Sequence, residues 1–210
     1  MTTEAKARDN TEEEALMAIE SEERRRERAR LLDEAIAAGA LPGPHEMDLY
    51  TLDNANPLHR DYDVVEQARE WTPGTGRCVY IWGPAYTIDK LGCALLNNAL
   101  DKLYTVASCD MRATVNMHAG HARCEYCTAA VLLARNIDAP LWGCPGALEP
   151  VIDLLSARRD VGRVTIATAQ VSPERFVDAE AAPEVQTMQA AALDCLNTAA
   201  GGPLVLHLQG

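Results

Sequence analysis

The sequence predicts an α/β protein with a mostly parallel sheet flanked by helices, preceded by one long N-terminal helix. From residue 61 onward, short apolar runs alternate with helical patterns of ten or more residues, which is the order that produces parallel sheets. Before residue 44 the chain is rich in charged residues at helical spacing. The hydrophobic fraction is 48% and the aromatic fraction 5%, so the core must consist chiefly of Ala, Leu, Val and Ile.

The N-terminal segment is expected to form one helix that ends near Gly39. Thr11 and Glu14 have the spacing of a capping box, and Glu22 and Arg26 lie four residues apart, which favours a helical ion pair. Large apolar residues flank the charged middle on both sides: Leu16, Ile19, Leu31, Leu32 and Ile36. Residues 11–38 therefore either dock on a partner, as a homo- or hetero-oligomer, or form a partly disordered tail with one docked turn.

Pro42, Gly43 and Pro44 are expected to end this helix and to mark a domain boundary. Residues 1–44 then form a charged helical arm with its linker, and residues 45–210 form a single α/β domain. In the domain, helices are expected at 61–70, 88–103, 127–134, 147–158 and 185–198. Strands are expected at 78–82, 104–107, 113–117, 140–142, 163–167 and 204–208. The clearest pattern is that of 88–103, where apolar residues recur with a period of 3.6.

Charge and hydropathy limit the classes of partner. The formal net charge is −12 and the pI is about 4.8, which argues against nucleic acid and anionic membranes as partners. No apolar stretch approaches the roughly 20 residues that span a bilayer, and the first residues lack the pattern of a secretory signal. A cytoplasmic protein is expected. Neither a Gly-x-Gly-x-x-Gly nor a Walker-type loop occurs, so nucleotide binding is not predicted.

A cluster of His and Cys residues is the feature that stands out most from the rest of the chain. His118 and His121 form one pair separated by two residues, and Cys124 and Cys127 form a second. Imidazole and thiolate are the preferred ligands of tetrahedral zinc, and this spacing lets both members of a pair face one ion. Cys109, at the end of a preceding strand, is a further candidate ligand. The pattern predicts zinc as cofactor.

If three of these side chains hold the ion, a coordination position is left for a water molecule that the metal activates. This arrangement predicts a zinc-dependent hydrolase or lyase that acts on a small polar substrate. Asp110 is the nearest carboxylate able to orient a ligand or move a proton. Cys144 lies in a sharp turn that resembles a nucleophile elbow, and it is the second catalytic candidate.

Other interpretations fit the same residues. Cys124 and Cys127 at a helix N-terminus could act as a dithiol oxidoreductase, because the helix dipole stabilises a thiolate. A metal could also be structural, in a non-catalytic subunit that docks through its N-terminal helix. Asp110 and Cys144 have structural alternatives as ordinary turn residues, and the cluster could have arisen by chance.

Overall fold

The computed structural model describes residues 3–37, 61–114, 125–138 and 148–209, and in them the chain forms a parallel sheet of five strands. The strand order is β2-β3-β4-β1-β5, and all four pairings between neighbours are parallel. The strands are β1 Val79–Trp82, β2 Val106–Asp110, β3 Val131–Arg135, β4 Val164–Ala169 and β5 Leu204–His207. The predicted α/β class with a parallel sheet is confirmed.

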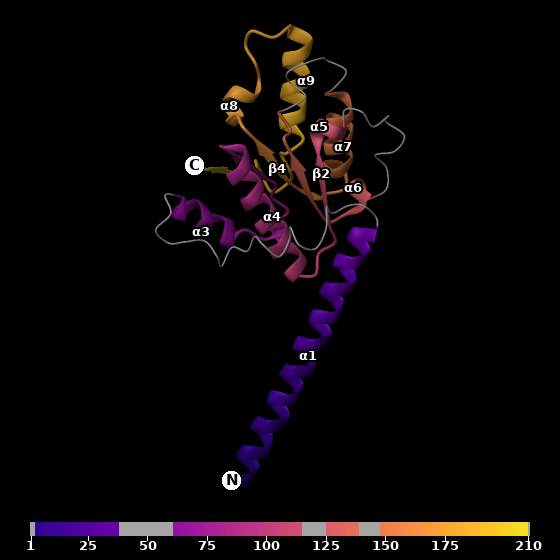
Figure 1. The fold of residues 1–210 in the computed structure, drawn as a ribbon, viewed down its shortest axis with the longest axis vertical. Helices are drawn as coiled ribbons and strands as arrows, with labels where there is room; N and C mark the ends of the chain where they lie inside the picture. Colours follow the sequence, from indigo (N-terminus) through magenta and orange to yellow (C-terminus); the bar gives the residue numbers. More distant parts are fainter. Residues whose placement is uncertain (1–2, 38–60, 115–124, 139–147, 210) are drawn as a thin grey trace.

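Helices cover both faces of the sheet (Figure 1). On one face lie α3 Tyr62–Glu70, α4 Ala85–Asp101 and the C-terminal part of α1 Thr3–Ala37. On the other face lie α7 Glu149–Asp160 and α9 Pro183–Asp194. The short helices are η2 Pro73–Thr75, α5 Met111–Thr114, α6 Glu125–Thr128 and α8 Pro173–Phe176. Among the described residues, no helix combines the length and the apolar character that crossing a bilayer requires.

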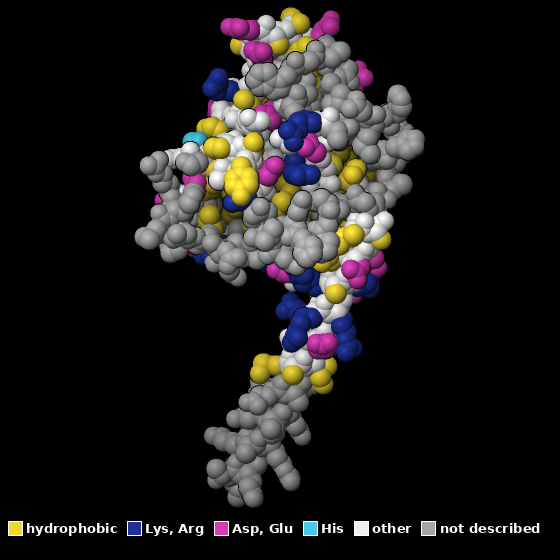
Figure 2. Space-filling view, in the orientation of Figure 1, with side chains coloured by type: hydrophobic (Ala, Val, Ile, Leu, Met, Phe, Trp, Pro, Cys, Tyr) yellow, Lys and Arg dark blue, Asp and Glu magenta, His cyan; other side chains and the backbone are white. Residues whose placement is uncertain are grey.

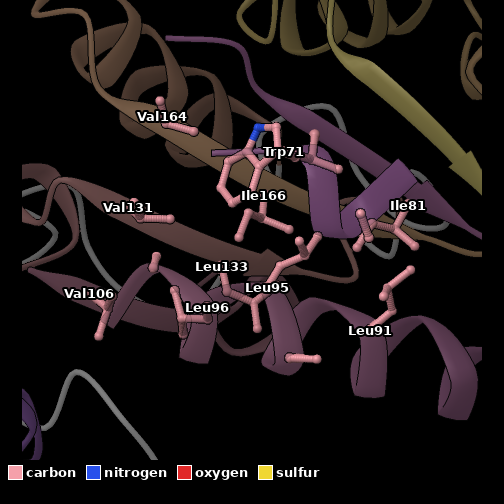
Figure 3. Packing of buried hydrophobic residues seen from close by; sticks show 14 of the residues in the cluster. Trp71, Ile81, Leu91, Leu95, Leu96, Val106, Val131, Leu133, Val164 and Ile166 are labelled. Carbon is pink, nitrogen blue, oxygen red and sulfur yellow. The ribbon is translucent and has the colours of Figure 1, made fainter. Parts of the chain in front are cut away.

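The apolar stripe of α4 forms the centre of the first core layer. Leu95 and Leu96 lie between the helix and the strands, next to Leu133 of β3 and Ile166 of β4 (Figure 3). The helix approaches the sheet closely at Gly92, since a Cβ there would lie 2.7 Å from a methyl carbon of Leu133. Burying this stripe stabilises the fold by about 25 cal/mol for each Å² removed from water.

The N-terminal helix leaves the domain as an arm (Figure 1). At its C-terminal end, Leu31 and Ala35 are buried in the first core layer, and Arg28 reaches Asp101 of α4 at 2.5 Å. Farther out, Ile19 is 56% exposed. The predicted long helix is confirmed, but it begins before Thr11, so Thr11 is inside the helix and does not cap it.

One expected helix was wrong. Residues 127–134 were predicted to be helical, whereas only the short α6 ends there and Val131–Arg135 is strand β3. A short continuous apolar run fits a buried helix or a strand buried on both faces, and β3 lies between β2 and β4. Residues 113–114, expected in a strand, belong to α5. The strand expected at 140–142 and the linker lie outside the described residues.

Candidate functional site

Polar side chains gather where β2, β3 and β4 end, together with one residue of α4. The carboxyl ends of parallel strands form the edge at which α/β sheets bind ligands. We call this group the edge cluster: Asp89, Asp110, Arg112, Arg135, Asn136 and Thr168. Figure 2 shows acidic and basic side chains together on this face of the domain, between α4 and α5.

Asp110 is the most strongly bonded member of the edge cluster. Its carboxylate accepts hydrogen bonds from Nη2 of Arg112 at 2.6 Å, from the Arg112 backbone N–H at 3.0 Å, and from the amide of Asn136 at 3.3 Å. Partial burial opposes ionisation, but these bonds outweigh it and hold the pKa of Asp110 below its ordinary value. Asp110 is therefore an ionised carboxylate that already accepts hydrogen bonds from Arg112 and Asn136.

Thr168 links α4 to the end of β3. Its hydroxyl donates to Asp89 at 3.4 Å and accepts from the backbone N–H of Asn136 at 3.2 Å. Asn136 adopts a positive φ of 56°, a conformation that Asn tolerates better than most residues. Burial raises the pKa of Asp89, although Arg135 and Thr168 partly counteract it. Asp89 is the carboxylate of the cluster that is hardest to ionise.

Aromatic side chains lie at the same edge of the sheet, at the carboxyl ends of β1 and β5 and in the first turn of α4. Trp82 and His207 stack with ring centroids 3.6 Å apart and planes within 2° of parallel. Tyr86, in the first turn of α4, is 70% exposed, and the ammonium group of Lys90 lies 3.9 Å from its ring centroid. This part of the edge therefore presents ring faces and one cation, in contrast to the ion-paired edge cluster.

Asp138 is a buried carboxylate close to the edge. It is only 2% exposed, and its Oδ2 accepts from the backbone N–H of Gln170 at 2.7 Å. Burial raises its pKa. It lines a pocket with residues of α8 and of the turn that follows, including Glu174, Phe176 and Asp178. Carboxylates, apolar side chains and the guanidinium of Arg175 line this pocket together.

The structure places only part of the predicted zinc site. Cys109 is buried in β2 on the face of the sheet that packs against α7 and α9, which we call the second core layer. Burial raises the pKa of its thiol to about 12. Cys127, half-buried on α6, packs against the same layer. His118, His121, Cys124 and Cys144 lie outside the described residues. Their roles, and zinc binding, stay predictions.

Within the ranges that the structure describes, no group of three or more His, Cys, Asp or Glu side chains is arranged to hold a metal ion. Asp110 lies at the end of β2, at this sheet edge, and its catalytic role stays a prediction. Sequence reasoning missed Asp89, Asn136 and Thr168, because they come from three separate segments. Recognising residues 131–135 as a strand would have placed Asn136 at the same edge as Asp110.

Comparison with known proteins identifies similar folds. No protein-family model matches the chain, and no curated protein sequence matches it. The structure of DnaI is similar with a TM-score of 0.58 and 12% identity, over 80% of this chain and 93% of that one. The DnaC helicase loader gives a TM-score of 0.56 and 12% identity, over 79% of this chain and 100% of that one.

Replication initiators share the fold as well. A DnaA replication initiator bound to AMPPCP and single-stranded DNA has a TM-score of 0.53 and 17% identity over 76% of this chain. AMPPCP-bound DnaA from Aquifex aeolicus has a TM-score of 0.55 and 17% identity over the same share. The chain spans about half of the length of these initiator structures, 50% in each case. At these identities the likeness concerns the fold.

The predicted zinc-dependent hydrolase or lyase is wrong, because the structures that share this fold are replication initiators and helicase loaders. The two alternatives, a metal-stabilised subunit and a dithiol oxidoreductase, have no counterpart among these structures. The spacing of His and Cys pairs is a local signal, and it carries no information about the strand order that defines this fold.

The predicted partners, a small-molecule substrate and no nucleic acid, are also wrong, since a protein with this fold is bound to single-stranded DNA and another loads a helicase. The physical reason is that net charge averages over the whole chain, whereas phosphate contacts depend on local charge. Residues 24–30 contain five arginines and one glutamate within a chain of net charge −12.

Proposed function

We propose that the chain acts in the initiation of DNA replication as a protein of the helicase-loader type, which binds a replicative helicase and helps to place it on single-stranded DNA. The observation that carries the proposal is the extent of the fold match. It includes 93% of DnaI and 100% of the DnaC helicase loader, but only half of the initiator structures. A cytoplasmic location accompanies this proposal.

The arginines of α1 support a contact with DNA. Arg25 and Arg26 have side chains that are 73% and 77% exposed, and both pair with Glu22, at 3.5 Å and 3.2 Å. Exposed ion pairs of this kind contribute little, about 0–1 kcal/mol, so a phosphate group can replace the carboxylate at small cost. Figure 2 shows basic side chains, with acidic ones among them, on the part of the arm next to the domain.

The arm also meets the domain at a hollow. Arg24, Arg25 and Arg28 line it together with Met17 of the same helix and Asp101 of α4. Arg28 is held by Asp101 and by Asn97, at 2.5 Å and 2.7 Å. Arg24 and Arg25 are exposed, and Glu20 lines the same hollow. Exposed arginines can reach the backbone phosphates of a nucleic acid.

The loading activity can be measured directly with purified proteins. The full chain is mixed with the replicative helicase encoded in the same genome, and the mass of the mixture is determined by light scattering. Helicase bound to circular single-stranded DNA is then quantified with and without the chain. We expect a stable complex and more helicase on the DNA. Absence of both effects would overturn the proposed function.

A charge-reversal pair tests the DNA contact separately. Arg24→Glu/Arg25→Glu removes two cations from the arm, and Arg159→Glu/Arg175→Glu makes the same change of charge on α7 and α8, away from the arm. Binding to a labelled single-stranded oligonucleotide is followed by fluorescence anisotropy at several salt concentrations. The arm variant should bind more weakly and lose about one unit of salt slope per lost phosphate contact. Equal binding by the two variants would exclude the arm as the DNA contact.

A further inference from the structure

The nucleotide implied by the neighbours of this fold can be tested against the residues present. DnaA structures with this fold are bound to AMPPCP, an analogue of a nucleoside triphosphate. Proteins of this kind cradle phosphates with the backbone N–H groups of a glycine-rich loop between a strand and the N-terminus of a helix. Here the corresponding connection, between β1 and α4, consists of Gly83 and Pro84 alone.

Three of the backbone donors at this junction, those of Gly83, Thr87 and Ile88, are already used within the chain. The N–H of Gly83 donates to the carbonyl of Ala169 at 3.3 Å, and Pro84 has no N–H. The N–H groups of Thr87 and Ile88 both donate to the carbonyl of Pro84, at 3.0 Å and 3.1 Å. The junction is thus a tight turn into the helix, without the wide loop whose N–H groups converge on a phosphate.

The C-terminal segment covers the same junction. The N–H of Leu208 donates to the carbonyl of Trp82 at 2.9 Å, continuing the pairing of β5 with β1. Gly83 has a φ of 143°, and a Cβ built on it would overlap the carbonyl oxygen of Leu208. The backbone of Leu208 therefore occupies the space beside Gly83, where a phosphate would have to approach.

Charge also opposes a phosphate here. Asp89 lies in the second turn of α4, bonded to Thr168 at the end of β4. Two of the three nearby cations face other groups: the ammonium of Lys90 lies over the ring of Tyr86, and the guanidinium of Arg112 is bonded to Asp110. The third, Arg135, partly offsets the effect of burial on Asp89. A triphosphate would therefore meet a carboxylate, and the chain itself already binds two of the three cations.

We infer that this chain does not bind a nucleoside triphosphate, because its own backbone and Asp89 occupy the position where the fold would hold the phosphates. The side chains of the edge cluster form hydrogen bonds with one another, and we infer that no triphosphate replaces these bonds. Any dependence of helicase loading on a triphosphate then resides in the helicase, and the chain itself is not switched by nucleotide.

The inference is tested on the full chain alone, without helicase or DNA, so its outcome is independent of the proposed function. Isothermal titration calorimetry with AMPPCP and Mg²⁺ is run beside thermal unfolding of the same samples, with Aquifex aeolicus DnaA as the binding control. We expect no saturable heat and no shift in Tm for this chain at concentrations that saturate the control. Saturable binding, or a rise in Tm with AMPPCP, would overturn the inference.

Discussion

The guanidinium of Arg158 donates to the hydroxyl of Thr165 at 3.1 Å from a position that water does not reach. Burial lowers the pKa of Arg158 to about 10, so the side chain stays charged at neutral pH. Its other donors reach backbone carbonyls of four residues: Tyr126 at 2.5 Å, Ala129 at 2.8 Å, Ala130 at 3.4 Å and Val164 at 2.5 Å. One side chain therefore connects α7 to α6 and to the starts of β3 and β4.

Arg158→Met should destabilise the protein strongly. The substitution leaves several buried carbonyls without a donor, and each unsatisfied group costs about 1–3 kcal/mol, so we expect a loss of at least about 3 kcal/mol. The matched control is Arg159→Met, which removes an exposed ion pair with Asp194 at 3.1 Å and should cost under about 1 kcal/mol. Urea unfolding measures both. Similar losses in the two variants would contradict the structural role of Arg158.

Arg158 also illustrates the limit of prediction from the sequence. The stripe of α4 and the strands near 78–82, 163–167 and 204–208 were found because their periodicity is local. The apolar residues Val151, Leu154 and Leu155 place position 158 on the buried face of α7. The residue there is an arginine, which is almost never fully buried unless it is paired, so composition favours the opposite prediction. The edge cluster was missed because Asp89, Asn136 and Thr168 meet only through the strand order, which the sequence pattern left open.

Gly83→Ala should be more costly than an ordinary substitution of a glycine. Gly83 has a φ of 143°, and an added Cβ would overlap the carbonyl oxygen of Leu208. The control is Gly162→Ala, where φ is 68° and nothing lies within 4 Å of the added Cβ. Gly162→Ala should cost about 1–2 kcal/mol from backbone strain alone, and Gly83→Ala clearly more. Equal shifts in the urea midpoint would show that Leu208 does not close the junction.

Asp89 and Asp110 should respond to pH with opposite signs. Burial raises the pKa of Asp89, so the unfolded carboxyl ionises near its ordinary value of 3.8 while the folded one still holds its proton, and stability falls as pH rises through this window. The pKa of Asp110 is lowered, mainly by Arg112 against the effect of burial, so its contribution is present above 3.8 and is lost on acidification.

Two amide variants test this difference. Relative to the wild type, Asp89→Asn should be more stable at pH 7, since it removes a carboxylate that burial disfavours and can keep a bond to Thr168. Asp110→Asn should be less stable at pH 7, because it loses the ion pair with Arg112. Both differences should shrink as pH falls below 4. Free energies of unfolding measured from pH 3 to pH 7 decide the point, and a change of the same sign in both variants would contradict it.

The buried cysteines Cys78 and Cys109 should be unreactive in the folded protein. Burial raises the pKa of Cys109 to about 12 and also raises that of Cys78, so neither forms much thiolate at pH 8, and the thiolate is the reactive species. Cys93 and Cys127 are half-buried and serve as internal controls. Alkylation with iodoacetamide at pH 8, followed by peptide mass spectrometry, should modify the controls well before Cys109 and Cys78.

In urea, all four cysteines should react with iodoacetamide at similar rates. Modification of Cys109 in the folded protein as fast as in urea would mean that its thiol faces solvent, where it could serve as the metal ligand that the sequence predicted.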